Sequence, residues 1–135
     1  MKASPSPTKT RELVIQALYQ KTISGDSNTK VLKELKQTQK GLNTEKVGEI
    51  VKDIKSLEQK FIDTIGKFSN IPTSRIGEIE LSILYLALYE ISLSQLDEPI
   101  IINEAIKLAK KFGQNSSHKF VNAILDMAIE EDKSI

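Results

Sequence analysis

Apolar residues recur every three or four positions along almost the whole chain, which is the spacing that gathers them on one face of an α-helix. Short polar or proline-containing stretches separate these stripes, and no strand-like alternation of apolar and polar residues interrupts them. The stripes predict helices over residues 9–23, 30–37, 44–66, 76–91, 99–112 and 117–128. We therefore expect an all-α fold, a compact bundle of six or seven helices.

The same pattern predicts the domain organisation. A chain of 135 residues with 39% apolar residues is the size of one domain that can bury a core. Two prolines among small polar residues predict a flexible arm over residues 1–8, followed by one helical domain over 9–130 and a tail over 131–135. Leu81 and Leu86 lie off the main stripe of the helix over 76–91, which predicts a central place for that helix.

Residues 102–126 contain two apolar stripes around a polar turn with the only histidine of the chain. The first stripe comprises Ile102, Ala105, Ile106, Ala109 and Phe112, and the second comprises Phe120, Val121, Ile124, Leu125 and Ala128. Gly113 is expected to end the first helix in the left-handed conformation, and Ser116 or Ser117 to accept hydrogen bonds from the first amides of the next. The turn would then present residues 114–119 to solvent.

Two interpretations of this turn are open. His118 at a helix start is most simply a capping or packing residue. Alternatively, Ser116, Ser117, His118 and Lys119 could donate to an anion such as an RNA phosphate, because the helix dipole and the first free amides favour negative charge there. Phe120 and Asn122 could add base stacking and base-edge hydrogen bonds, although Phe120 fits the core equally well.

Composition narrows the function classes. Cysteine is absent, which excludes disulfides, thiolate metal sites and thiol nucleophiles. The sequence has no glycine-rich phosphate loop and no HExxH motif, so we expect neither an enzyme nor a bound metal or cofactor. No apolar run approaches the roughly 20 residues of a membrane span, and the cytoplasm is the expected compartment.

The charge of the chain is unevenly distributed. Its net value is only +1, but residues 1–40 contain eight basic side chains and three acidic ones. This excess suits a face that meets phosphate, and it suits a solvated lysine-rich helix surface about as well.

Three blocks of sequence resemble a known family. The segments INEA, LAKKFG and SHKFVNAILD within residues 102–126 are similar to the C-terminal signature of the NusB (N-utilisation substance B) antitermination factors. RELVIQALY at residues 11–19 resembles the first helix of that family, and LYLALYEI at residues 84–91 resembles its central buried helix. The resemblance implies the same helical fold and a protein that is not an enzyme.

The resemblance also implies partners. NusB proteins bind the boxA element of ribosomal RNA leaders, as single-stranded RNA, together with NusE, a small-subunit ribosomal protein. The complex keeps RNA polymerase from terminating. For this chain, the resemblance implies that RNA contacts Lys9, Arg11, Gln16, Tyr19, Ser116, His118, Lys119, Phe120 and Asn122. Glu80 is the implied contact with NusE, and Tyr85, which is displaced from the apolar face of its helix, is either a core residue or part of the same partner surface.

This sequence departs from the family pattern in its basic residues. The arm SPSPTKTR offers only Lys9 and Arg11, and Tyr85 replaces an arginine of some relatives, whereas Ser116, uncharged where some relatives carry an acid, partly offsets these losses. Fewer neutralised phosphates predict weak RNA binding by the isolated chain and a modest salt dependence. Two alternatives remain open: a protein-interaction bundle that has lost RNA binding, and the RNA-binding domain type found in ribosomal RNA cytosine methyltransferases. A homodimer that covers the RNA face is also compatible with the sequence.

Overall fold

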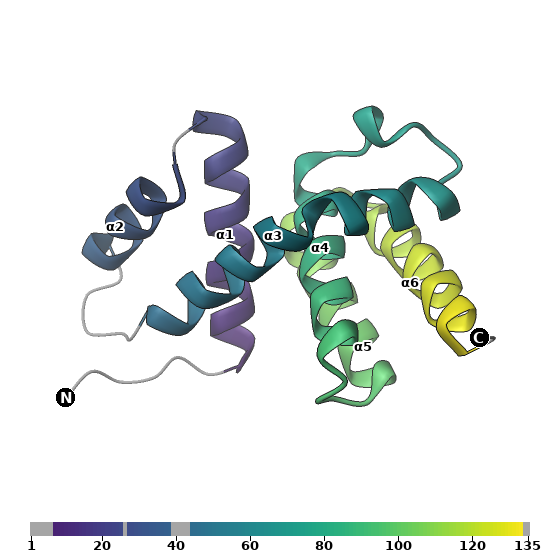
Figure 1. Ribbon diagram of the computed structural model, residues 1–135. Coiled ribbons are helices and arrows are strands. Elements are labelled where there is room, and N and C mark those ends of the chain that lie inside the picture. Colours follow the sequence, from purple (N-terminus) through teal and green to yellow (C-terminus); the bar gives the residue numbers. More distant parts are fainter. Residues whose placement is uncertain (1–6, 26, 39–43, 134–135) are drawn as a thin grey trace. The chain divides into compact units, whose positions relative to one another are not determined.

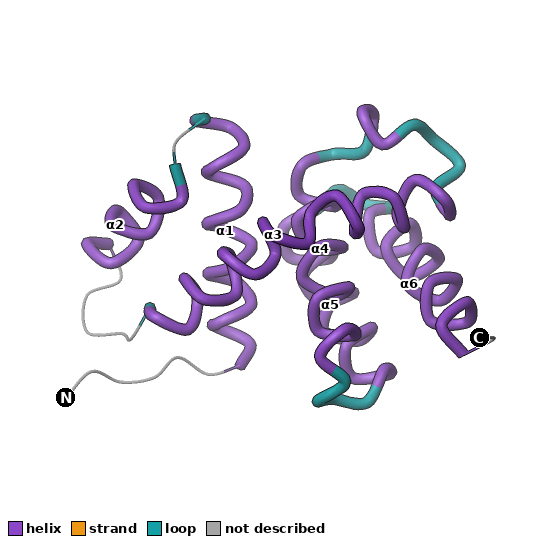
Figure 2. Tube along the Cα trace, viewed as in Figure 1, coloured by secondary structure: helices purple, strands orange, loops and turns teal. Residues whose placement is uncertain are grey.

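The computed structural model describes residues 7–25, 27–38 and 44–133. Within them it contains six α-helices, α1 (Pro7–Ser24), α2 (Asn28–Thr38), α3 (Glu45–Phe68), α4 (Glu78–Leu93), α5 (Glu98–Phe112) and α6 (Ser117–Lys133), and the 3-10 helix η1 (Thr73–Arg75). Figures 1 and 2 show these helices joined by loops, with no strand in the described part of the chain. The predicted all-α fold is confirmed.

The chain divides into two compact units, Met1–Ser56 and Leu57–Ile135, and the boundary lies inside α3. The first unit contains α1, α2 and the beginning of α3. Helices α1 and α2 pack together, and the Gln20 side-chain amide donates a hydrogen bond of 2.6 Å to the Glu34 carboxylate between them. Val14, Ala17 and Leu18, which share the helical spacing expected of a core face, are buried in α1.

The second unit is built from the end of α3 and from α4, α5 and α6 (Figure 1). Helix α4 packs against both α5 and α6. It is buried on several sides, as the off-stripe residues predicted, because Leu81 and Leu86 are 9% and 2% exposed. The break before α4 is also as predicted: Pro72 is extended, with φ −58° and ψ 142°, and η1 follows it.

Several boundaries and faces differ from the sequence-based predictions. Helix α1 begins at Pro7, because proline is tolerated in the first turn of a helix, so the predicted arm extends at most to residue 6, outside the described residues. Gly66 lies inside α3. In α5 the buried apolar residues are Ile101, Ala105, Leu108 and Ala109, whereas Phe112 is 40% exposed. The apolar face of α5 is therefore rotated from the predicted one. The predicted single domain over residues 9–130 stays a prediction.

Candidate nucleic-acid interface

The turn between α5 and α6 is shaped by a close approach of the two helices. The amide of Gly113 donates to the carbonyl of Ala109 at 2.9 Å and closes α5. Gly113 has φ −91° and ψ −171°, so the predicted left-handed conformation is wrong. A Cβ at this position would lie 2.7 Å from the Ala109 carbonyl oxygen and 2.7 Å from the Ser117 hydroxyl oxygen. Glycine is required here because it has no side chain.

Ser117 holds this turn from inside. It is 5% exposed, and its hydroxyl oxygen accepts a hydrogen bond of 2.8 Å from the amide of Gln114. The predicted cap, in which Ser116 or Ser117 accepts from the first amides of α6, is therefore wrong for Ser117, whose hydroxyl acts on the preceding turn. The backbone carbonyl of Ser116 accepts from Lys119 and Phe120, at 3.1 and 3.4 Å. These bonds start α6 at Ser117.

The His118 amide has no hydrogen-bond acceptor among the described residues. It lies in the first turn of α6, where the positive end of the helix dipole favours an anion. Ser116 and Lys119 are exposed beside it, and the His118 side chain is half-buried. The N-terminal end of α6 thus offers a backbone donor and a lysine to a phosphate.

Phe120 and Asn122 follow on the first two turns of α6. Both are half-buried, whereas the neighbouring Val121 is 0% exposed and belongs to the core. Phe120 is therefore neither a fully buried core residue nor a freely exposed ring. Part of each side chain remains accessible for a base.

Glu80 connects α4 to this turn. Its carboxylate oxygen Oε1 accepts a hydrogen bond from the Ser117 hydroxyl. The other oxygen folds back over Gly77, the residue before α4, where a Cβ would collide with it. The predicted contact of Glu80 with NusE stays a prediction, and the structure gives this carboxylate a partner inside the chain.

Tyr85 lies further along α4 and is half-buried. Burial raises the pKa of its hydroxyl to about 12, and the negative charges of Glu58 and Glu78 add to this rise. The tyrosine therefore lies in a negative environment, which disfavours RNA phosphate and leaves the prediction of a protein-binding surface open.

The remaining candidates lie on α1, in the first unit. Gln16 is exposed and Tyr19 is 38% exposed, and residues three apart share one helix face. Lys9 is half-buried and Arg11 only 8% exposed, and both interact with other groups of the chain. A buried guanidinium that already has a partner has few donors left for RNA. The RNA contacts predicted for these four residues stay predictions.

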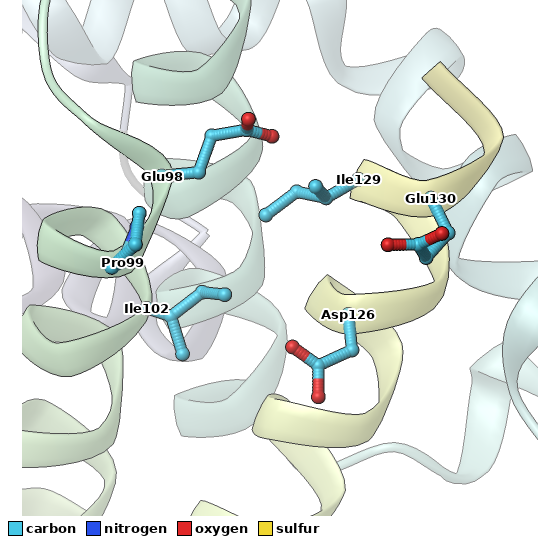
Figure 3. A pocket seen from close by; sticks show the side chains of 6 residues that line it. All are labelled: Glu98, Pro99, Ile102, Asp126, Ile129 and Glu130. Carbon is cyan, nitrogen blue, oxygen red and sulfur yellow. The ribbon is translucent and has the colours of Figure 1, made fainter. Parts of the chain in front are cut away.

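The structure also shows a groove that the sequence did not indicate. A cavity of about 430 Å³ opens between the beginning of α5 and the end of α6 (Figure 3). Its lining residues are Glu98, Pro99, Ile102, Asp126, Ile129 and Glu130. Three carboxylates around an apolar floor repel phosphate, so RNA is not expected here. In the sequence, the spacing of Asp126 and Glu130, one helical turn apart, could have indicated an acidic surface at this place.

The described residues contain no group of three or more histidine, cysteine, aspartate or glutamate side chains that could hold a metal ion. None of the described helices combines the length and the apolar character that crossing a bilayer requires.

Comparison with known proteins gives a consistent result. The sequence model of the NusB family matches residues 8–130. The transcription antitermination protein NusB of Aliarcobacter butzleri is 36% identical over 126 residues, which cover 91% of this chain and 96% of that protein. The structure of T. maritima NusB is 28% identical, with a TM-score of 0.83 over 97% of this chain and 94% of that one.

A structure of the antitermination factors NusB and NusE in complex with dsRNA contains the same fold. Its TM-score is 0.82 at 21% identity, over 92% of this chain and 96% of that one. The family match covers most of the sequence, and the relative of 36% identity covers most of both chains. This chain belongs to the NusB family.

Proposed function

We propose that this chain is a transcription antitermination factor that binds boxA-type RNA of ribosomal RNA leaders together with NusE. Family membership supports this proposal, because curated relatives of similar length are named transcription antitermination proteins. The single structural observation that carries it is the N-terminal end of α6, where exposed Lys119 and the His118 amide, which has no acceptor among the described residues, lie at the positive end of a helix.

The RNA contacts fall into two groups under this proposal. The first comprises Ser116, His118, Lys119, Phe120 and Asn122 at the start of α6. The second comprises Lys9, Gln16 and Tyr19 on α1, with Arg11 acting from a buried position. Lysines bind the phosphates and position the strand, while the aromatic and amide side chains contact bases.

NusE is the proposed protein partner. A NusB of the same fold has been solved with NusE and dsRNA, which supports a ternary complex of this kind. We assign the protein contacts to the acidic part of α4 around Tyr85. Assembly with RNA polymerase and a cytoplasmic location follow from the same function, and self-association would compete with RNA if it covered the start of α6. We propose no catalytic step.

The second candidate function is a protein-interaction bundle that has lost RNA binding. The buried Arg11 and the acidic groove favour it, because both reduce the positive surface available to phosphate. The methyltransferase-associated domain has no comparable support, since the curated relative from Aliarcobacter butzleri is matched over 96% of its own length.

A fluorescence titration tests the proposal. A labelled boxA-like RNA and a scrambled RNA are titrated with the chain, alone and with NusE, at two salt concentrations. Selective binding that strengthens with NusE is the expected result. Lys9→Glu should weaken it, whereas Lys52→Glu, an equal charge change at an exposed lysine of the first unit, should not. Binding of NusE with no selective RNA binding would support the interaction bundle instead.

A further inference from the structure

Glu80 has a defined position between two segments that are far apart in sequence. It is the third residue of α4, and one carboxylate oxygen folds back over Gly77 at the beginning of that helix. The other accepts from Ser117, which is 37 residues further along the chain. A Cβ at Gly77 would collide with this carboxylate, so the glycine makes room for it.

Ser117 connects Glu80 to the turn between α5 and α6. Its hydroxyl has one proton, which it donates to Glu80, and its oxygen accepts from the Gln114 amide at 2.8 Å. Gly113 lets the turn approach the hydroxyl, since a Cβ there would lie 2.7 Å from the Ser117 oxygen. With the proton directed to Glu80, a lone pair of the hydroxyl is directed to Gln114.

We propose that Glu80 is a positioning residue for RNA binding, which holds the Gln114–Lys119 turn through Ser117 in the shape that presents the His118 amide and Lys119 to a phosphate. This inference rests on the proposed RNA-binding function. It assigns Glu80 a role within the chain, where family resemblance alone predicts a contact with NusE.

The charge of Glu80 makes its role distinguishable. A carboxylate near a phosphate site repels the ligand, so its charge does not favour RNA binding. Glu80 favours RNA binding instead through its oxygen, which accepts the hydrogen bond from Ser117. A glutamine keeps an acceptor and removes the charge, whereas an alanine removes both. Glu80→Gln should therefore bind RNA at least as tightly as the unchanged chain, and Glu80→Ala should bind it more weakly.

Two measurements test the proposal on the full chain. Amide hydrogen exchange by NMR reports the Gln114 hydrogen bond without any ligand, and a boxA-like RNA titration with NusE reports affinity. Glu80→Ala and Ser117→Ala should each accelerate exchange at Gln114 and weaken RNA binding, both by about threefold to tenfold. The double variant should be no worse than either single one, because both remove the same connection.

Glu49→Ala is the control, since it truncates a glutamate in the same way at an exposed position of α3. It should leave Gln114 exchange and RNA affinity unchanged. Unchanged Gln114 exchange in Glu80→Ala, or a Glu80→Gln variant as weak as Glu80→Ala, would overturn the proposal. Loss of NusE binding alone in Glu80→Ala would also overturn it and favour a partner contact. If the unchanged chain binds no RNA, the proposed function fails, and Gln114 exchange still decides whether Glu80 holds the turn.

Discussion

The two ends of α6 differ in charge and in what they offer to a ligand. The first turn has an exposed Lys119 and a His118 amide that bonds to no acceptor in the described part of the chain. The C-terminal half contributes Asp126, Ile129 and Glu130 to an acidic groove with an apolar floor. The helix dipole adds positive potential to the first end and negative potential to the second. One helix therefore separates a surface suited to phosphate from one that repels it.

The acidic residues at the end of α6 lie where the dipole disfavours them. Glu131 is compensated by Lys67 of α3, at 2.6 Å, whereas Glu130 is exposed at the rim of the groove. Each carboxylate in the last turn of a helix lowers the stability of the folded state by about 0.3–1 kcal/mol. Their presence fits a role in repelling nucleic acid from this end.

The largest expected effect comes from the middle of α6, on which both ends depend. Leu125 is 0% exposed, so Leu125→Ala should lower the free energy of unfolding by about 2–5 kcal/mol. Urea denaturation followed by circular dichroism measures this. Ala123→Ser, at an exposed position of the same helix, is the control and should change little. A loss below about 1 kcal/mol for Leu125→Ala would show that α6 is not anchored as described.

Charge reversal should affect RNA affinity differently at the two ends of α6, as measured by an RNA titration with NusE. Lys119→Glu should weaken binding roughly tenfold, because a phosphate contact becomes a repulsion. It should not lower the melting temperature, since an acid in the first turn suits the dipole. Glu130→Lys should not weaken binding, and Lys60→Glu, at an exposed lysine of α3, should have little effect. Equal losses for Lys119→Glu and Lys60→Glu would contradict the difference between the ends.

Neutral substitutions give a smaller and more specific effect. The slope of log affinity against log salt should flatten by roughly 0.7–0.9 in Lys119→Gln, because one phosphate contact is lost. Glu130→Gln should keep the slope of the unchanged chain. The same titration at several salt concentrations measures both, and a flattened slope in Glu130→Gln would place the phosphates at the wrong end of α6.

Tyr85 on α4 tests whether negative potential extends beyond the groove. With a pKa raised to about 12, its hydroxyl stays neutral in the folded chain over a range in which an unfolded tyrosine, with a pKa of about 10, ionises. Its contribution to stability is therefore complete below about pH 10 and is lost as the pH rises through about 12.

Tyr85→Phe should remove this pH dependence and the absorbance change at high pH that belongs to Tyr85. Urea unfolding between those pH values and a spectroscopic titration measure the two effects. Glu58→Gln should lower the pKa of Tyr85, since the Glu58 charge contributes to the rise. A pKa that does not respond to Glu58 would leave burial and the Glu78 charge as the causes of the rise.

Sequence periodicity predicted the helices and the central place of α4, because both depend on local spacing. It did not predict which residues of α5 face the core, since Leu108 and Phe112 both fit a helical stripe and packing decides between them. Gly113 suggested a left-handed residue, but its backbone is extended, and a Cβ there would meet Ser117, which follows from tertiary packing and not from local spacing.

The candidate site was predictable only in part. The polar turn and its lysine were visible in the sequence, and family resemblance added the α1 residues. The Glu80–Ser117 hydrogen bond and the acidic groove join residues on different helices, and a spacing pattern within one helix contains no information on such pairs. The buried position of Arg11 depends on tertiary packing in the same way.

The most direct measurement is an NMR titration of the isotope-labelled chain with boxA-like RNA in the presence of NusE, compared with NusE alone. RNA should shift the amide signals of Ser116–Lys119 and leave those of Asp126–Glu130 unchanged. Shifts confined to the groove end of α6, or equal shifts at both ends, would contradict the account.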